Sequence, residues 1–168
     1  VEVIDDRNVL VKKLEIVPLE VIIRNVAAGS LSKRLGLEEG VPMSIPVIEM
    51  CYKNDDLGDP MVNRYHILAC KLATAEELDI IEAQALKINE IMVKYLKTKD
   101  IDLIDFKLEF GRDKDGKIIL ADEISPDNCR FWDSNTHEKL DKDRFRRDLG
   151  NVEDAYKEIL RRLTGEER

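Results

Sequence analysis

Hydrophobic and polar residues alternate along several stretches of this chain, most regularly over residues 103–111, LIDFKLEFG. The even-numbered positions of this stretch are apolar, and Asp105, Lys107 and Glu109 stand between them. Such alternation predicts a β-strand with one face in a hydrophobic core. The opposite face then carries three charges in a row, and it is either a solvated surface or the floor of a site.

A different periodicity begins after residue 74. Apolar residues recur at spacings of three and four from Leu78 to Tyr95, which predicts a long amphipathic helix. Thr74 and Glu77 stand where a capping box would begin this helix. Several lysines near its end suit the negative end of the helix dipole.

Shorter patterns complete the expected fold. Apolar runs bounded by glycine, proline and polar residues predict strands over 9–13, 19–25, 101–111 and 117–124, with another beginning at Pro46. Short helices are predicted over 31–36, 141–148 and 151–163, and residues 125–136 are expected to be irregular. Blocks of strands and blocks of helices favour an α+β fold with antiparallel sheet.

Composition narrows the class of protein. Of the 168 residues, 43% are hydrophobic and 37% are charged, which is typical of a globular protein. The net charge of −8 argues against a broad nucleic-acid surface. No apolar run approaches the ~20 residues that cross a membrane, and three widely spaced cysteines fit a reducing compartment. We therefore expect a soluble cytoplasmic protein without nucleic-acid or membrane partners.

The sequence Asp115-Gly116 predicts a hairpin between the last two strands. If these two residues form the turn, Glu109 stands opposite Asp122, and two facing carboxylates repel each other. A shared proton, nearby basic side chains or a divalent metal such as Mg²⁺ would hold them together. A slip of one residue would bring Glu123 to the same position. The plainer interpretation is a solvated face, but Asp122 leads directly into the irregular segment, where functional residues concentrate.

A second polar cluster surrounds Arg24. This arginine lies in an apolar strand and is followed by the segment Ala-Ala-Gly-Ser. Gly29 would let a ligand approach the backbone, and Arg24 and Ser30 could together hold a phosphate. An edge ion pair and an ordinary Gly-Ser turn explain the same residues without a ligand. Lys53 and Asp59 lie in a polar turn, and Arg146 lies in a charged helix, which are ordinary surface features.

Taken in order, five segments resemble the SAICAR synthetases (phosphoribosylaminoimidazole-succinocarboxamide synthases) of purine biosynthesis. The segments are PLEVIIRNVAAGSLSKRLGLEEG, YKNDDLGDP, DFKLEFG, LADEISPDNCRFWD and DKDRFRRDLG. The resemblance covers essentially the whole chain. One departure is Asn128, where the family often has threonine.

The resemblance implies an enzyme of two α+β lobes, similar to ATP-grasp and kinase-like enzymes, with ATP in the cleft. Such an enzyme is an ATP- and Mg²⁺-dependent ligase. It joins carboxyaminoimidazole ribonucleotide to L-aspartate by way of a proposed acyl phosphate, and gives SAICAR, ADP and phosphate. We expect a homo-oligomer.

The resemblance also assigns roles by position. Lys107, Glu109 and Asp122 are expected to be catalytic, with Glu109 and Asp122 binding both magnesium and the nucleotide phosphates. The backbone of Glu15, Ile16 and Val17 is expected to meet adenine. The expected substrate-binding residues are Arg24, Ser30, Lys53, Asp59, Asp105, Arg130 and Arg146.

The start of the chain leads to a further expectation. The first residues already read as strands and do not begin with Met, whereas the family has an N-terminal lobe with a glycine-containing phosphate loop. We therefore expect residues 1–17 to be the end of that lobe and a hinge, and residues 18–168 to be the lobe that binds substrate and metal. Two alternatives are a non-catalytic piece that binds the ribonucleotide and a structural interaction module.

Overall fold

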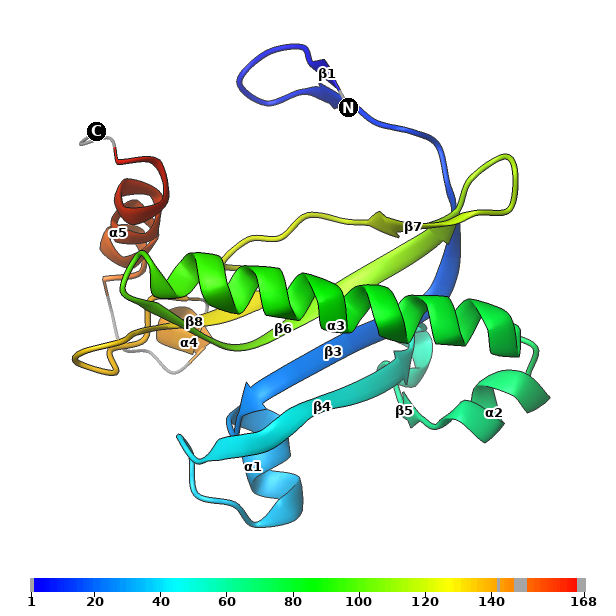
Figure 1. Cartoon of the computed structure of the whole chain (residues 1–168), viewed down its shortest axis with the longest axis horizontal. Coiled ribbons are helices and arrows are strands. Elements are labelled where there is room, and N and C mark those ends of the chain that lie inside the picture. Colours follow the sequence, from blue (N-terminus) through cyan, green and yellow to red (C-terminus); the bar gives the residue numbers. More distant parts are fainter. Residues whose placement is uncertain (1, 142, 147–150, 166–168) are drawn as a thin grey trace.

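The computed structural model describes residues 2–141, 143–146 and 151–165. Its centre is an antiparallel sheet of six strands in the described chain, with the order β5-β4-β3-β6-β7 and with β8 also paired to β6. The long helix α3 lies across one face of this sheet (Figure 1). The strands are β3 (Glu15–Val26), β4 (Pro42–Tyr52), β5 (Met61–Val62), β6 (Ile101–Arg112), β7 (Ile118–Ala121) and β8 (Cys129–Asp133).

The two central strands sort their side chains by face, as the alternation predicts. Val21 pairs with Leu108 and Ile23 with Phe106 across β3 and β6, and all four are buried. They share one hydrophobic cluster with apolar residues of α3. Each large apolar side chain buried in this way contributes about 1.5–3 kcal/mol. This packing leaves the other face of β3 and β6 for polar residues.

Helix α3 (Ala75–Lys97) begins where the capping box predicts. The Thr74 hydroxyl accepts a hydrogen bond from the Glu77 N–H at 3.2 Å, and the Glu77 carboxylate accepts one from the Thr74 N–H at 2.8 Å. Two N–H groups that the first turn leaves without a helical partner are thereby satisfied. The capping-box prediction is confirmed.

The shorter helices lie at the ends of the sheet (Figure 1). Gly36, with φ 64°, closes α1 in the left-handed conformation that glycine favours. Residues 142, 147 and 148 of the helix predicted over 141–148 lie outside the described part of the chain. The helices are α1 (Gly29–Leu35), α2 (Arg64–Ala69), α4 (Asp143–Arg146) and α5 (Val152–Thr164), and η1 (Asp55–Leu57) is a 3-10 turn.

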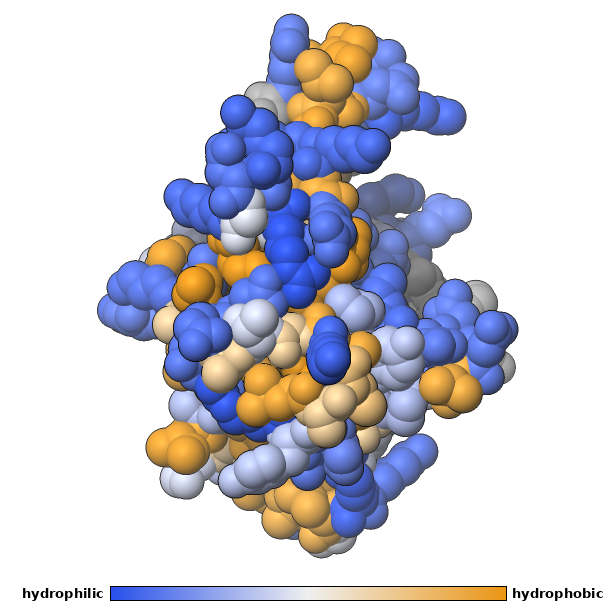
Figure 2. Space-filling view, turned by 90° about the vertical axis from the view of Figure 1, so that its right-hand side faces the viewer, coloured by the Kyte–Doolittle hydropathy of each residue, from blue (hydrophilic) through white to orange (hydrophobic). Residues whose placement is uncertain are grey.

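A small hairpin stands away from the sheet at the N-terminal end (Figure 1). Its strands are β1 (Glu2–Val3) and β2 (Val9–Leu10), so the strand predicted over 9–13 is much shorter than expected. Its apolar side chains are exposed, Val3 at 73% and Leu10 at 58%. Figure 2 shows hydrophobic side chains gathered on this hairpin at the top of the view.

Two expectations about element boundaries change. Strand β3 begins at Glu15 and pairs with β6 from its first residue, so the predicted lobe boundary after residue 17 falls inside a strand. That division stays a prediction. Residues 129–133, expected to be irregular, form β8 against β6. No helix in the described part of the chain is long and apolar enough to span a membrane.

Candidate active site

The polar face of β3 and β6 is the floor of a cavity. Arg24 pairs with Asp105, Ile22 with Lys107 and Glu20 with Glu109 across the two strands. A cavity of about 510 Å³ opens above this face. It brings together seven of the residues that the sequence singles out, from β3 to β8: Arg24, Ser30, Asp59, Asp105, Lys107, Asp122 and Arg130. Two of the three charged residues of the LIDFKLEFG strand, Asp105 and Lys107, therefore line a cavity that other elements share, and Glu109 lies outside its lining.

Lys107 is the centre of one half of this cavity. Its Nζ lies 2.5 Å from Glu109 Oε1, 3.3 Å from Asp122 Oδ2 and 3.4 Å from Glu20 Oε1. Burial alone would lower the pKa of this ammonium, but the hydrogen bond to Glu109 and the surrounding carboxylates hold the pKa above its ordinary value. Lys107 is therefore a fixed positive charge among three acidic groups.

Glu109 has a second basic partner. The Lys53 Nζ lies 2.7 Å from Glu109 Oε1, and this hydrogen bond raises the pKa of Lys53. Glu109 is buried, with 6% of its surface exposed. Burying a carboxylate is costly unless basic groups pair with it. Lys53 therefore joins the predicted site through Glu109.

The predicted pairing of Glu109 with Asp122 is wrong by one residue. Glu109 stands opposite Ala121. The connection runs from Asp113 to Lys117, with Gly116 at φ 77°, so the hairpin has a three-residue loop with glycine in the left-handed position. Asp122 follows the end of β7 with φ 64°. Its carboxylate reaches Lys107 after this backbone turn, and Glu123 does not take the position opposite Glu109.

The acidic groups around Lys107 are chemically suited to magnesium. Glu109 and Asp122 supply hard carboxylate oxygens, and Mg²⁺ is commonly held by one or two carboxylates together with substrate phosphates and water. The described residues contain no ready-made group of three or more potential metal ligands. Two carboxylates beside an open cavity thus fit a metal that arrives with a phosphate ligand.

The other half of the cavity is built around two arginines. Arg24 donates from Nη1 to Asp105 at 2.9 Å and from Nη2 to the Ser30 hydroxyl at 2.9 Å. Arg130 donates from Nη1 to both oxygens of Asp105, at 3.0 and 2.9 Å, and from Nε to Asp143 at 2.9 Å. Asp105 thus links both guanidinium groups in one network.

Charge compensation keeps Arg130 protonated although it is largely buried. Burial opposes its positive charge, but Asp105 and Asp143 together raise its pKa above the ordinary value. Arg130 occupies the space beside Gly29. A Cβ atom at Gly29 would lie 2.6 Å from Arg130 Nη2, and φ there is 53°. Glycine at this position therefore makes room for the arginine.

The remaining predicted residues lie at different distances from this centre. Asp59 lines the cavity, and its Oδ1 accepts a hydrogen bond from the Asn54 N–H at 2.8 Å. Glu15 pairs with Arg112, Ile16 is 43% exposed and Val17 is buried in the core. They lie at the start of β3, outside the lining of the cavity. Arg146 is the last residue of α4, and its side chain lies outside the described part.

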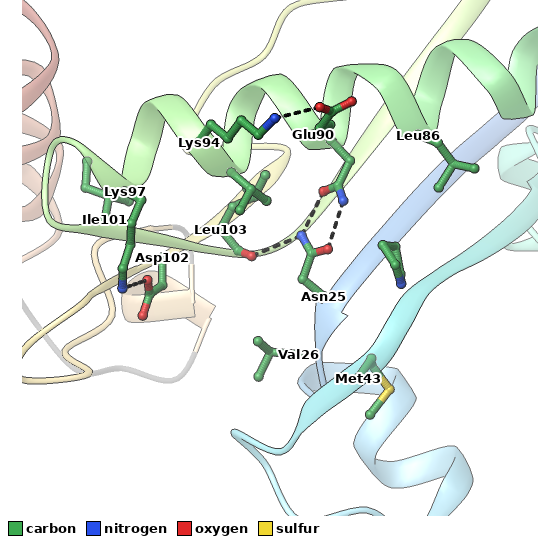
Figure 3. A pocket seen from close by; sticks show the side chains of 13 residues that line it. Asn25, Val26, Met43, Leu86, Glu90, Lys94, Lys97, Ile101, Asp102 and Leu103 are labelled. Atoms are coloured by element: carbon green, nitrogen blue, oxygen red, sulfur yellow. Dashed lines mark hydrogen bonds and ion pairs between the residues drawn. The ribbon is translucent and has the colours of Figure 1, made fainter.

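A second cavity, of about 560 Å³, lies beside α3 (Figure 3). Its lining is mainly apolar, and its amides are paired, with Asn25 Nδ2 2.8 Å from Asn89 Oδ1. The charged residues on its rim also pair, Lys94 with Glu90 and Lys97 with Asp102. The polar cavity on the opposite face is therefore the better candidate for an active site.

Comparison with known proteins identifies the family. The SAICAR synthetase family model matches residues 1–163. The chain belongs to the SAICAR synthetase family. The phosphoribosylaminoimidazole-succinocarboxamide synthase of Coprothermobacter proteolyticus is 65% identical over 163 residues, which are 97% of this chain and 69% of the relative.

Two solved structures agree in fold with this SAICAR synthetase family member. A SAICAR synthetase in complex with ADP is 56% identical with a TM-score of 0.90, over 93% of this chain and 66% of that one. The synthase from Ehrlichia chaffeensis is 47% identical with a TM-score of 0.95, over 100% of this chain and 72% of that one. The chain thus spans about two thirds of the length of these relatives.

Several residues of the cavity were not predicted from the sequence as site residues of this SAICAR synthetase family member. Glu20, Ile22, Asp127 and Asn128 line the cavity, and Glu49 and Asp143 hold the two arginines from outside the predicted set. Glu20 could have been found, because it shares the alternation of β3 with Arg24. Asp143 lies 13 residues from its partner in a charged helix, and nothing local distinguishes it.

Proposed function

We propose that this chain catalyses the ATP-dependent ligation of L-aspartate to carboxyaminoimidazole ribonucleotide, giving SAICAR, ADP and phosphate in purine biosynthesis. Membership of the family makes it an ATP-dependent carbon–nitrogen ligase. One observation supports the proposal most strongly. Lys107 and Asp122 line the same cavity as Arg24 and Arg130, and Glu109 contacts Lys107 from outside its lining.

The reaction requires two displacements, the first at the γ-phosphorus of ATP and the second at the carboxyl carbon of the ribonucleotide. A carboxylate oxygen of the ribonucleotide takes the γ-phosphoryl group of ATP, and ADP leaves. The amine of aspartate then attacks the acyl carbon, the C–N bond forms, inorganic phosphate leaves and the amine loses a proton. Both steps depend mainly on positioning and charge neutralisation.

Lys107 is suited to the first step. Its ammonium is held in the cavity by three carboxylates, and it would neutralise charge on the transferring phosphoryl group. Glu109 and Asp122 would hold Mg²⁺, which would supply further neutralisation of the phosphates when bound. In this role Lys53 supports Glu109, to which it is hydrogen bonded. The backbone of Glu15, Ile16 and Val17 would receive adenine.

The arginine half of the cavity would hold the ribonucleotide. Arg24, Ser30 and Arg130 offer N–H and O–H donors for its phosphate, and guanidinium groups are well matched to phosphate oxygens. Asp105 would orient the two arginines that it bridges. We also propose that Asp59 and Arg146 bind the substrates, without assigning either residue to a particular group of the ligand.

The substitution Arg24→Ala tests this assignment. We expect it to weaken ribonucleotide binding by about 1.5–3 kcal/mol, the size of a hydrogen bond to a charged group. ATP binding should change by less than about twofold, because Arg24 lies in the other half of the cavity. Calorimetry with each ligand measures both effects. An equal loss for the two ligands would assign Arg24 a structural role.

Product formation tests the reaction itself. SAICAR should form only when ribonucleotide, ATP with Mg²⁺, and aspartate are all present. Ligand binding without any SAICAR would contradict the proposed reaction. A requirement for Mg²⁺ that Ca²⁺ does not satisfy would support the metal role, because Mg²⁺ prefers octahedral geometry and keeps several waters.

We also propose that the protein acts in the cytoplasm as a homo-oligomer. Exposed apolar side chains support self-association, since Ile45 on β4 and Ile91 on α3 are 72% and 56% exposed. Sedimentation equilibrium measures the oligomeric state. A monomer at micromolar concentration would contradict this part of the proposal.

A further inference from the structure

Glu49 lies behind Arg24, outside the cavity. It is on β4, directly opposite Ile22 of β3, and only 9% of its surface is exposed. Its Oε2 lies 2.7 Å from Arg24 Nε. Its other oxygen pairs with Arg34 of α1. Glu49 is absent from the cavity lining, so it can act on a ligand only through other side chains.

The contact with Glu49 completes the fixation of Arg24. Each of the three guanidinium nitrogens now has one partner from a different element: Nε bonds Glu49 of β4, Nη1 bonds Asp105 of β6, and Nη2 bonds Ser30 of α1. A guanidinium carries five N–H groups, so one N–H remains on each of Nη1 and Nη2. Arg24 lines the cavity, and these two are the groups that it would offer to a ligand there.

We propose that Glu49 is a positioning residue for the ribonucleotide site, and that it sets the plane of the Arg24 guanidinium so that two N–H groups meet a phosphate together. The inference rests on the proposed role of Arg24 in phosphate binding. Bidentate contacts of this kind depend on the orientation of the guanidinium as well as on its charge.

The charge of Glu49 argues against a simple electrostatic role. A carboxylate next to a phosphate site repels the ligand by Coulomb's law. What Glu49 contributes to phosphate binding is therefore orientation, and its charge opposes binding. Orientation and charge therefore affect phosphate binding in opposite directions, and substitutions at Glu49 that change only one of them can distinguish the two effects.

Two substitutions make this separation. Glu49→Asp keeps the charge but withdraws the carboxylate by about 1.5 Å, the length of one C–C bond. Glu49→Gln removes the charge but keeps an oxygen within reach of Arg24 Nε. We expect Glu49→Asp to raise the dissociation constant of the ribonucleotide about tenfold, equivalent to one charged hydrogen bond. Glu49→Gln should stay within about threefold of the original protein or bind more tightly.

ATP binding and thermal melting distinguish positioning from general damage. Both variants should bind ATP as the original protein does and should melt as a single folded species. A loss of affinity for both ligands in Glu49→Asp would indicate a distorted fold and would overturn the inference. An unchanged ribonucleotide affinity in Glu49→Asp would also overturn it.

Arg34→Met is the matched control. It removes the other partner of Glu49 and leaves the contact with Arg24. If Glu49 served only to attach α1, Arg34→Met would weaken ribonucleotide binding as much as Glu49→Asp does, and the inference would fail. Arg24→Ala separates this failure from that of the proposed function. If Arg24→Ala weakens binding but Glu49→Asp does not, only the positioning role is lost. If neither variant weakens binding, both proposals are lost.

Discussion

At the scale of single residues, Lys107 determines how the acidic cluster behaves. Without basic partners, the carboxylates of Glu109 and Asp122 would repel each other, and removing one of the two charges would stabilise the protein. Here Glu109 accepts hydrogen bonds from both Lys107 and Lys53. Asp122 is farther from Lys107, at 3.3 Å, and its side chain is 30% exposed. The two acids therefore differ in their structural roles, although both are proposed to bind magnesium.

Glu109→Gln and Asp122→Asn separate these roles. We expect both substitutions to abolish magnesium-dependent turnover. Glu109→Gln should also lower the free energy of unfolding by about 1–3 kcal/mol, because two ammonium groups lose a charged acceptor. Asp122→Asn should lower it by less than about 1 kcal/mol, as is usual for an exposed pair. Turnover across a magnesium titration and urea unfolding measure the two effects.

Asp115→Asn is the control for this pair, because Asp115 lies at the tip of the same hairpin and its side chain is 73% exposed. It should alter neither turnover nor stability. Near-normal turnover in Glu109→Gln or Asp122→Asn would contradict the metal role. Greater stability in Glu109→Gln would show that repulsion outweighs the contacts with the lysines.

At the scale of elements, Glu77 connects the start of α3 to the sheet. It completes the capping box with Thr74, and it also accepts hydrogen bonds from Arg112 Nε and Nη2 of β6, at 2.5 and 2.9 Å. Thr74→Ala should cost about 1 kcal/mol of unfolding free energy through loss of the cap. Glu77→Ala should cost about 2–4 kcal/mol, because the charged bonds to Arg112 are lost as well.

Urea unfolding followed by the fluorescence of Trp132, the single tryptophan and a buried residue, measures both variants. Lys87→Ala, on the exposed middle of the same helix, is the control and should change stability by less than about 0.5 kcal/mol. Equal losses in Thr74→Ala and Glu77→Ala would show that the bonds to Arg112 contribute nothing.

Elements with strong local signals were predictable from the sequence. The start of α3 follows from Thr74 and Glu77, and the strand character of β6 follows from its alternation. The register of the β6–β7 hairpin did not follow, because Asp-Gly suits both a two-residue and a three-residue loop. Strand β8 was missed because its stability comes from pairing with β6, which is distant in sequence.

The candidate site shows the same division. Some site residues could be predicted because each belongs to a recognisable pattern within its own segment. The structure brings four of them into one cavity: Arg24, Ser30, Asp105 and Lys107. The partners that hold the two arginines could not be predicted. Glu49 is 25 residues from Arg24 and meets it only because β4 pairs with β3. Such contacts depend on sheet topology, which the local pattern does not contain.

At the scale of the whole molecule, stability depends on acids with opposite pKa shifts. Burial raises the pKa of Asp141 from 3.8 to about 6, although the N–H groups of Asp143 and Phe131 donate to its carboxylate. The N–H groups of Thr136 and Asn135, together with Arg162, lower the pKa of Asp133. Arg162 of α5 donates a hydrogen bond to the carboxylate of Asp133, and this contact connects α5 to β8.

These shifts act over different pH ranges. A lowered pKa gives stability that is present above about pH 4 and is lost as the pH falls further. Asp133 contributes in this direction. A raised pKa acts in the opposite sense, because the folded protein prefers the neutral carboxyl group. The contribution of Asp141 is complete below pH 3.8 and is lost as the pH rises through about 6.

The substitution Asp141→Asn isolates this effect, because asparagine does not ionise. Its amide keeps only one of the two acceptor oxygens of Asp141, which costs a constant amount at every pH. The cost of ionising Asp141 disappears only where the original protein carries the charge. We therefore expect the free energy of unfolding of the variant, relative to the original protein, to rise by about 2–3 kcal/mol between pH 4 and pH 7. Urea unfolding of both proteins at several pH values measures this difference. A difference that stays constant across this range would show that Asp141 titrates normally, and a difference that falls would show that its charge is stabilised by Arg130 and the surrounding N–H groups.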